Sequence, residues 1–164
     1  IGLPFFDILN KIGIKKKFHL EIDKYYSEYS LKNINIIKPY QNINKLLKIL
    51  TENKFKISII TSKNSTRTNE IINKLFNKDL FSSIITPDRL NLKRGKPHPD
   101  SLYLSCYETG ISLEKTLYIG DMESDFLFAQ NSNVKFIHAR WGYEKKTYSA
   151  ISVNSVNELI RLFN

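Results

Sequence analysis

Two aspartates in the segment GDMESD at 120–125 have a spacing that suits a divalent cation. Gly120 allows a tight turn at the end of an expected strand, and Asp125 lies one helical turn beyond Asp121 on the same face. One or two carboxylates, together with water and a phosphate, are the usual ligands of Mg²⁺. The alternative is structural, because Asp121 could cap a helix and Asp125 could stabilise its first turn. The spacing leaves both interpretations open.

A stiff loop, RGKPHPD at 94–100, presents a lysine. Pro97 and Pro99 flank His98 and restrict the backbone, and Pro99 is placed to begin a helix. Lys96, held in such a loop, could neutralise a phosphate or a carboxylate nucleophile, and the alternative is an ordinary solvated lysine. We assign His98 a structural role.

An apolar run ends in two hydroxyl side chains, Thr61 and Ser62, within IITSKN at 59–64. A hydroxyl followed by backbone N–H groups that turn toward a helix can bind phosphoryl oxygens. Strands often end in threonine, so this pattern alone does not decide between a phosphate site and an ordinary strand end.

These three segments lie in an alternation of apolar strands and helices that predicts a parallel α/β sheet. Strands are expected over 57–61, 81–85, 116–120 and 134–138, and helices over 43–50, 71–76, 102–107, 125–129 and 155–163. Ligands of such sheets bind beyond the carboxyl ends of the strands. Thr61, Lys96 and Asp121 are therefore expected to converge at one edge of the sheet.

A different pattern precedes Lys38-Pro39, where proline disfavours helix in the residue before it. Apolar and aromatic residues recur at helical spacing at Phe18, Ile22, Tyr25, Tyr26 and Tyr29. The spacing predicts an amphipathic helix, and we expect its tyrosines to pack against a second helix rather than face a ligand.

Composition is that of a globular chain: 164 residues, of which 41% are hydrophobic and 25% charged. The formal charge of +9 raises nucleic acid as a partner, but the longest basic run is Lys15–Lys17, and lysine is abundant together with isoleucine and asparagine, as AT-rich genomes favour. No apolar run approaches the roughly 20 residues of a membrane span. The single Cys106 cannot form an internal disulfide, so we expect a cytoplasmic protein without a membrane partner.

In this order and spacing, the three segments resemble the haloacid-dehalogenase-like (HAD) superfamily, most closely its phosphoglycolate-phosphatase-like branch. Thr61 matches the family's second motif, Lys96 the third, and the GDxxxD pattern at 120–125 the fourth. Trp141-Gly142-Tyr143 resembles the family's segment after the fifth strand. The resemblance implies a Rossmann-like parallel sheet with flanking helices, and a Mg²⁺-dependent phosphatase that acts on a small phosphorylated metabolite through an aspartyl-phosphate.

The resemblance also implies a role for each matched residue. Asp121 and Asp125 would bind Mg²⁺, with Asp125 assisting through water or by orienting its neighbours. Thr61, Ser62 and Lys96 would bind the phosphoryl group, and Thr61 and Lys96 would belong to the catalytic set.

The family's first motif, DxDxT, is absent from the 164 residues. Phe6-Asp7-Ile8-Leu9 contains one aspartate but neither the second nor the threonine. In the family the first aspartate attacks phosphorus and the second protonates the leaving group. The resemblance places this motif on the central strand, between the strands that carry Thr61 and Asp121. Because the sequence starts at Ile1 and its one methionine is Met122, we expect that strand upstream of Ile1.

We therefore expect residues 1–37 to be the C-terminal half of a helical cap, and residues 38–164 to be a HAD-like core that lacks its first strand and is inactive alone. Two alternatives stay open: a degenerate homologue that binds Mg²⁺ or phosphate without turnover, and a basic α/β domain that binds nucleic acid. The sequence indicates neither the phosphomonoester nor the oligomeric state.

Overall fold

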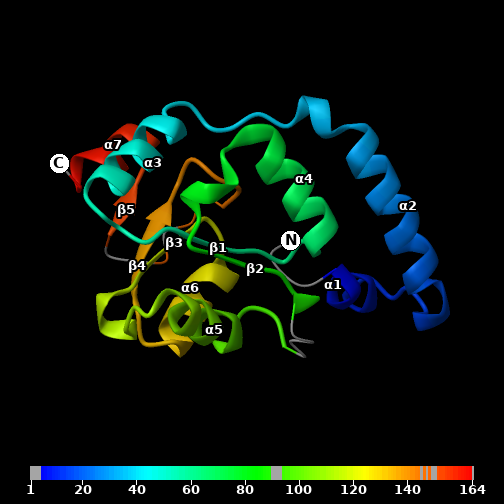
Figure 1. The fold of residues 1–164 in the computed structure, drawn as a ribbon. Helices are drawn as coiled ribbons and strands as arrows, with labels where there is room; N and C mark the ends of the chain where they lie inside the picture. Colours follow the sequence, from blue (N-terminus) through cyan, green and yellow to red (C-terminus); the bar gives the residue numbers. More distant parts are fainter. Residues whose placement is uncertain (1–4, 90–93, 145, 147, 149–150, 164) are drawn as a thin grey trace.

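The structure is a computed structural model that describes residues 5–89, 94–144, 146, 148 and 151–163. Strands and helices alternate along most of this chain (Figure 1). The strands are β1 (Ser58–Ile60), β2 (Ser83–Ile85), β3 (Leu117–Gly120), β4 (Lys135–Ala139) and β5 (Ser152–Val153). The helices are α1 (Phe5–Lys11), α2 (His19–Lys32), α3 (Ile43–Glu52), α4 (Ser65–Leu75), α5 (Asp100–Thr109), α6 (Glu123–Asn131) and α7 (Val156–Arg161), with short 3₁₀ turns η1 (Lys16–Phe18), η2 (Ile34–Ile36), η3 (Lys78–Leu80) and η5 (Leu113–Lys115).

The helices and strands expected from apolar periodicity all form, although their ends differ by some residues. Helix α4 begins at Ser65, earlier than its apolar residues indicate, because the Asn64 side chain accepts a hydrogen bond of 3.0 Å from the Arg67 N–H and caps the helix. Two elements, α1 and β5, were not predicted. They are seven and two residues long, too short to show a hydrophobic period.

The five strands form two separate parallel sheets. In the first, β1 pairs with β2, with Ile60 opposite Ile85. In the second, the order is β3-β4-β5, with Gly120 opposite His138. Among the described residues, β1 and β3 are therefore each hydrogen-bonded to another strand along one edge only.

An apolar groove of about 420 Å³ lies between β1 and β3. Both strands line it, together with side chains from neighbouring elements, among them Leu50, Phe55, Leu102, Cys106 and Phe163. Strands inside a parallel sheet are buried on both faces and are mostly apolar, so the groove has the chemistry of a strand position. It lies where the sequence resemblance puts the central strand that carries the first motif.

Helices cover both sides of the strands (Figure 1). Helices α5 and α6 lie on one side, where α5 contacts β1 and β2, and α6 contacts β3 and β4. Helices α3, α4 and α7 lie on the other side, and α3 packs against α7. The main apolar cluster joins α3 and α7 to the second sheet through Leu46, Ile137, Val153, Val156, Leu159 and Ile160.

Helix α2 extends away from the sheets and contacts α4 and α1 (Figure 1). Tyr26 stacks on Phe5 of α1 with ring centroids 4.7 Å apart. Tyr25 and Tyr29, however, are 64% and 70% exposed. The prediction that the tyrosines pack against a second helix is therefore wrong for these two, because α1 is only seven residues long and covers only part of α2. No helix in the described part of the chain is long and apolar enough to cross a bilayer.

Amide hydrogen exchange, measured by NMR, tests the open edge of β1. The Thr61 N–H donates to the Ile85 carbonyl at 3.1 Å, and strand alternation turns the Ile60 N–H toward the groove. We expect the Ile60 amide to exchange at least about tenfold faster than the Thr61 amide, because exposed backbone groups open at little cost. Equal protection of the two amides would contradict an open groove.

Candidate active site

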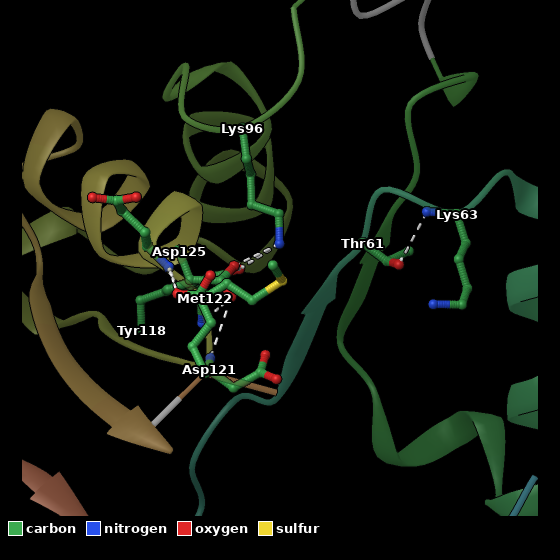
Figure 2. A network of polar contacts seen from close by, with 9 residues as sticks. Thr61, Lys63, Lys96, Tyr118, Asp121, Met122 and Asp125 are labelled. Carbon is green, nitrogen blue, oxygen red and sulfur yellow. Dashed lines mark hydrogen bonds and ion pairs between the residues drawn. The ribbon is translucent and has the colours of Figure 1, made fainter. Parts of the chain in front are cut away.

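A buried ion pair joins the RGKPHPD loop to the start of α6 (Figure 2). The Lys96 Nζ lies 2.6 Å from Asp125 Oδ1, and the Tyr118 hydroxyl lies 3.3 Å from Nζ and 3.2 Å from Oδ1. The side chains of Lys96 and Asp125 are only 11% and 7% exposed. Lys96 is therefore not an ordinary solvated loop lysine.

Electrostatics keep this network charged. Burial favours the neutral amine, but the Tyr118 oxygen and the Asp125 carboxylate outweigh burial and raise the pKa of Lys96. Burial also raises the pKa of Tyr118 to about 12, with Lys96 opposing the shift and Asp125 adding to it. Near neutral pH Lys96 is thus an ammonium and Tyr118 a neutral phenol.

Asp125 uses its second oxygen to hold the turn after β3. Its Oδ2 accepts hydrogen bonds from the N–H groups of Asp121 and Met122, both at 3.3 Å. A Cβ at Gly120 would overlap the Asp125 side chain, so glycine is required at this strand end. Both oxygens of Asp125 accept from donors of the chain, and the geometry favours the orienting role over direct metal binding.

Asp121 is not the helix cap of the structural alternative. Helix α6 begins at Glu123 with Met122 as its N-cap, and the Asp121 carboxylate accepts instead from the Tyr143 N–H at 2.7 Å. A Cβ at Gly142 would overlap this carboxylate, so Gly142 makes room for it. The side chain of Asp121 is therefore held by the loop that follows β4 and not by helix α6.

The loop that presents Lys96 is fixed at both ends. Arg94 forms a two-pronged ion pair with Asp100, with N···O distances of 3.0 and 3.1 Å. The Asn131 side chain donates to the Pro97 carbonyl at 2.9 Å and ties the loop to the end of α6. These contacts hold the lysine stem in one place without using its ammonium group.

Thr61, Ser62 and Lys96 line one small pocket of about 20 Å³. The Thr61 Oγ1 accepts from the Lys63 N–H at 3.2 Å and shapes the turn after β1. Asp121 does not line this pocket, but in Figure 2 its carboxylate points toward the side on which Thr61 and Lys63 lie. The structure thus brings the three phosphate-site candidates together at one pocket, and the Asp121 carboxylate points toward that side from outside the pocket lining.

The acidic residues of the site offer one position for a divalent cation. In the ranges that the structure describes, no three His, Cys, Asp or Glu side chains form a metal-binding group. Asp121 keeps one carboxylate oxygen that is not bonded to Tyr143. Since Mg²⁺ is often held by one or two carboxylates plus water and phosphate, Asp121 fits one position in such a site.

Two contributors to the site were not predicted. Tyr118 lies two residues before Gly120 and so lies on the same side of β3. This period of two could have indicated Tyr118 as a contributor to the site. Tyr143 contributes only its main-chain N–H, which residue type does not encode.

Three comparisons relate the chain to known proteins. Residues 1–139 match the family model of haloacid dehalogenase-like hydrolases. The chain is 26% identical over 124 residues to a phosphoglycolate phosphatase from Mannheimia succiniciproducens, covering 75% of this chain and 54% of that protein. It is 26% identical over 150 residues to the pyrophosphatase PpaX of Bacillus mycoides, covering 90% of this chain and 67% of that one. The chain thus spans about half to two thirds of the length of these relatives.

Solved structures share the fold. A hydrolase from Pseudomonas syringae superposes with a TM-score of 0.85 at 18% identity, covering 99% of this chain and 80% of that one. A beta-phosphoglucomutase from Clostridium difficile gives a TM-score of 0.80 at 19% identity, covering 96% and 74%. The arrangement of helices around parallel strands is therefore that of a Rossmann-like HAD fold.

Two conservative substitutions separate the roles of the aspartates. Asp125→Asn leaves the buried Lys96 ammonium without its carboxylate, so we expect a loss of about 3–5 kcal/mol in the free energy of unfolding. Asp121→Asn keeps an oxygen that can accept from the Tyr143 N–H, so we expect a loss below about 1 kcal/mol. Urea unfolding followed by circular dichroism measures both. Equal losses would contradict the roles assigned here.

Proposed function

Because the chain belongs to the haloacid dehalogenase-like hydrolases, we propose that it forms the phosphate-binding part of a Mg²⁺-dependent phosphatase for a small phosphomonoester. One observation carries the proposal: a buried, charged Lys96 lines the same small pocket as Thr61 and Ser62, at the carboxyl ends of the strands. A fixed cation beside hydroxyl and main-chain donors suits a phosphoryl group.

The chain's own residues then have separate tasks. The Thr61 hydroxyl and the Ser62 N–H donate to phosphoryl oxygens. Lys96 offsets the negative charge that a carboxylate nucleophile and a phosphoryl group share when they approach. Because Asp125 already holds the ammonium, the site needs little reorganisation when substrate binds.

Asp121 is the residue that would hold Mg²⁺, and Asp125 would keep the turn beneath it in place. When bound, the cation would supply Lewis-acid neutralisation of phosphoryl charge. Gly142 and the Tyr143 N–H would fix the direction of the Asp121 carboxylate.

The nucleophile belongs to the groove in this proposal. The 164 residues contain no Asp-x-Asp pair. A parallel strand between β1 and β3 would end between Thr61 and Asp121, so an aspartate at its end would face the phosphoryl pocket. We include in the proposal that residues 1–37 are the C-terminal half of a cap over a core formed by residues 38–164. The relatives, which are longer than this chain, support a core completed by a further segment.

The substrate class in this proposal is a small phosphorylated metabolite of the cytoplasm. Relatives named phosphoglycolate phosphatase and pyrophosphatase support a small substrate. No feature of the described residues favours a nucleic-acid partner over this class.

Complementation with a strand peptide tests the proposal. The peptide has five apolar β-branched residues followed by Asp-x-Asp-x-Thr, and the control peptide has asparagine at both aspartate positions. We expect the chain alone to leave p-nitrophenyl phosphate intact. With Mg²⁺ and the aspartate peptide it should release p-nitrophenol, whereas the control peptide should give none.

Asp121→Asn should abolish the restored activity, and excess Mg²⁺ should not recover it, because the metal-binding oxygen is lost. Binding of both peptides without any turnover would contradict the phosphatase proposal and favour the binding module without activity. Turnover by the chain alone would contradict the placement of the nucleophile in the groove.

A further inference from the structure

Two cationic side chains come shortly after Thr61 and Ser62 in the sequence and have no role in the proposed function so far. Lys63 comes two residues after Thr61, and its own N–H bonds to the Thr61 hydroxyl. Arg67 lies in the first turn of α4, where Asn64 caps its N–H. Both therefore start from a backbone that is fixed next to the candidate phosphoryl site.

Arg67 is buried without a counter-charge. Arg67 is only 6% exposed, and its Nε has no hydrogen-bond partner among the described residues. Its guanidinium lies 4.3 Å from the ring centroid of Tyr26 in α2, and Tyr26 in turn stacks on Phe5. The aromatic ring fixes the guanidinium against the cap helix but supplies no negative charge.

No carboxylate of the described residues pairs with either cation. The ion pairs in this part of the chain belong to other cations, namely Lys48, Arg89, Arg94 and Lys96. Burial, followed by the charge of Arg67, lowers the pKa of Lys63, while Asp121 acts in the opposite direction. The two cations thus repel each other within range of the residues of the active site.

Lys63 is exposed, but the buried guanidinium of Arg67 is costly without a counter-charge unless an anion joins it. A guanidinium keeps its charge in proteins, so Arg67 cannot escape this cost by becoming neutral. The helix amides do not provide the site, because Asp88 accepts from the Ser65 N–H at 2.9 Å and Asn64 accepts from the Arg67 N–H. The unused binding capacity therefore belongs to the side chains of Lys63 and Arg67.

We propose that Lys63 and Arg67 form a subsite for a second anionic group on the leaving group of the substrate. The inference rests on the proposed phosphatase function and narrows it to phosphorylated compounds whose leaving group carries a carboxylate or a second phosphate close to the scissile P–O bond. A guanidinium fork binds either group through two parallel hydrogen bonds. Tyr26 acts as a positioning residue because it holds the fork in place.

Isothermal titration calorimetry of the 164-residue chain tests this subsite with three probes. Ethyl phosphate has a neutral leaving group, 2-phosphoglycolate adds a carboxylate, and pyrophosphate adds a second phosphate. We expect at least one of the two doubly anionic probes to bind about tenfold or more tightly than ethyl phosphate, and the one that does identifies the second group.

Arg67→Gln should lower the affinity for that probe by about 10–100-fold and the affinity for ethyl phosphate by less than about threefold, because only the second anion contacts Arg67. Arg161→Gln is the matched control, since it removes the same charge from an exposed position on α7 and should change the affinity for neither probe. Lys63→Gln should reproduce the selective loss, and it serves as the test if Arg67→Gln unfolds the chain. Thr61→Ala should lower the affinity for all three probes.

The outcomes separate the two proposals. One outcome is that ethyl phosphate binds, that its binding needs Thr61, and that the Arg67 and Lys63 variants lower the affinity for all probes equally or for none. The subsite proposal is then wrong and the proposed function stands. If the wild-type chain binds none of the probes, both proposals are contradicted.

Discussion

The buried pair of Lys96 and Asp125 is the interaction on which the rest of the candidate site depends. Buried charges are tolerated when they are paired and hydrogen-bonded, and here Tyr118 and two main-chain N–H groups complete the pairing. The pair joins the loop that carries Lys96 to the turn between β3 and α6, and the two residues lie 29 positions apart in the chain. Asp125 accepts hydrogen bonds from the turn that carries Asp121 and also pairs with the Lys96 ammonium, so the positions of Asp121 and Lys96 are linked.

The second constraint is the division of the sheet. The hydroxyl donors lie at the end of β1 in one sheet, and Asp121 lies at the end of β3 in the other (Figure 2). Lys96 connects the two halves, since it lines the pocket with Thr61 and pairs with Asp125 beyond β3. A strand in the groove would give both halves one continuous sheet and would bring its last residues to the point where the two sets of side chains meet.

Much of this arrangement could be predicted from local pattern. The strand and helix order follows from apolar periodicity, and the choice of Thr61, Lys96 and Asp121 as candidates follows from their places after strands or in a stiff loop. The division between the two roles of Asp125 could not be predicted, because it depends on which donors reach each oxygen in three dimensions. The exposure of Tyr25 and Tyr29 was missed because helical spacing does not reveal how long the opposing helix is. Arg67 was missed for a similar reason, since its lack of a counter-charge is a property of the folded neighbourhood and leaves no mark on the sequence.

The central claim is that Thr61, Ser62 and Lys96 form a phosphoryl site. A crystal structure of the chain with tungstate, a tetrahedral oxyanion that anomalous scattering locates directly, tests it most directly. The account predicts tungstate in the pocket of these three residues, with oxygens in hydrogen-bond reach of the Thr61 hydroxyl and the Lys96 ammonium, and no tungstate there in Thr61→Ala crystals. Tungstate bound only elsewhere, with this pocket empty, would contradict it.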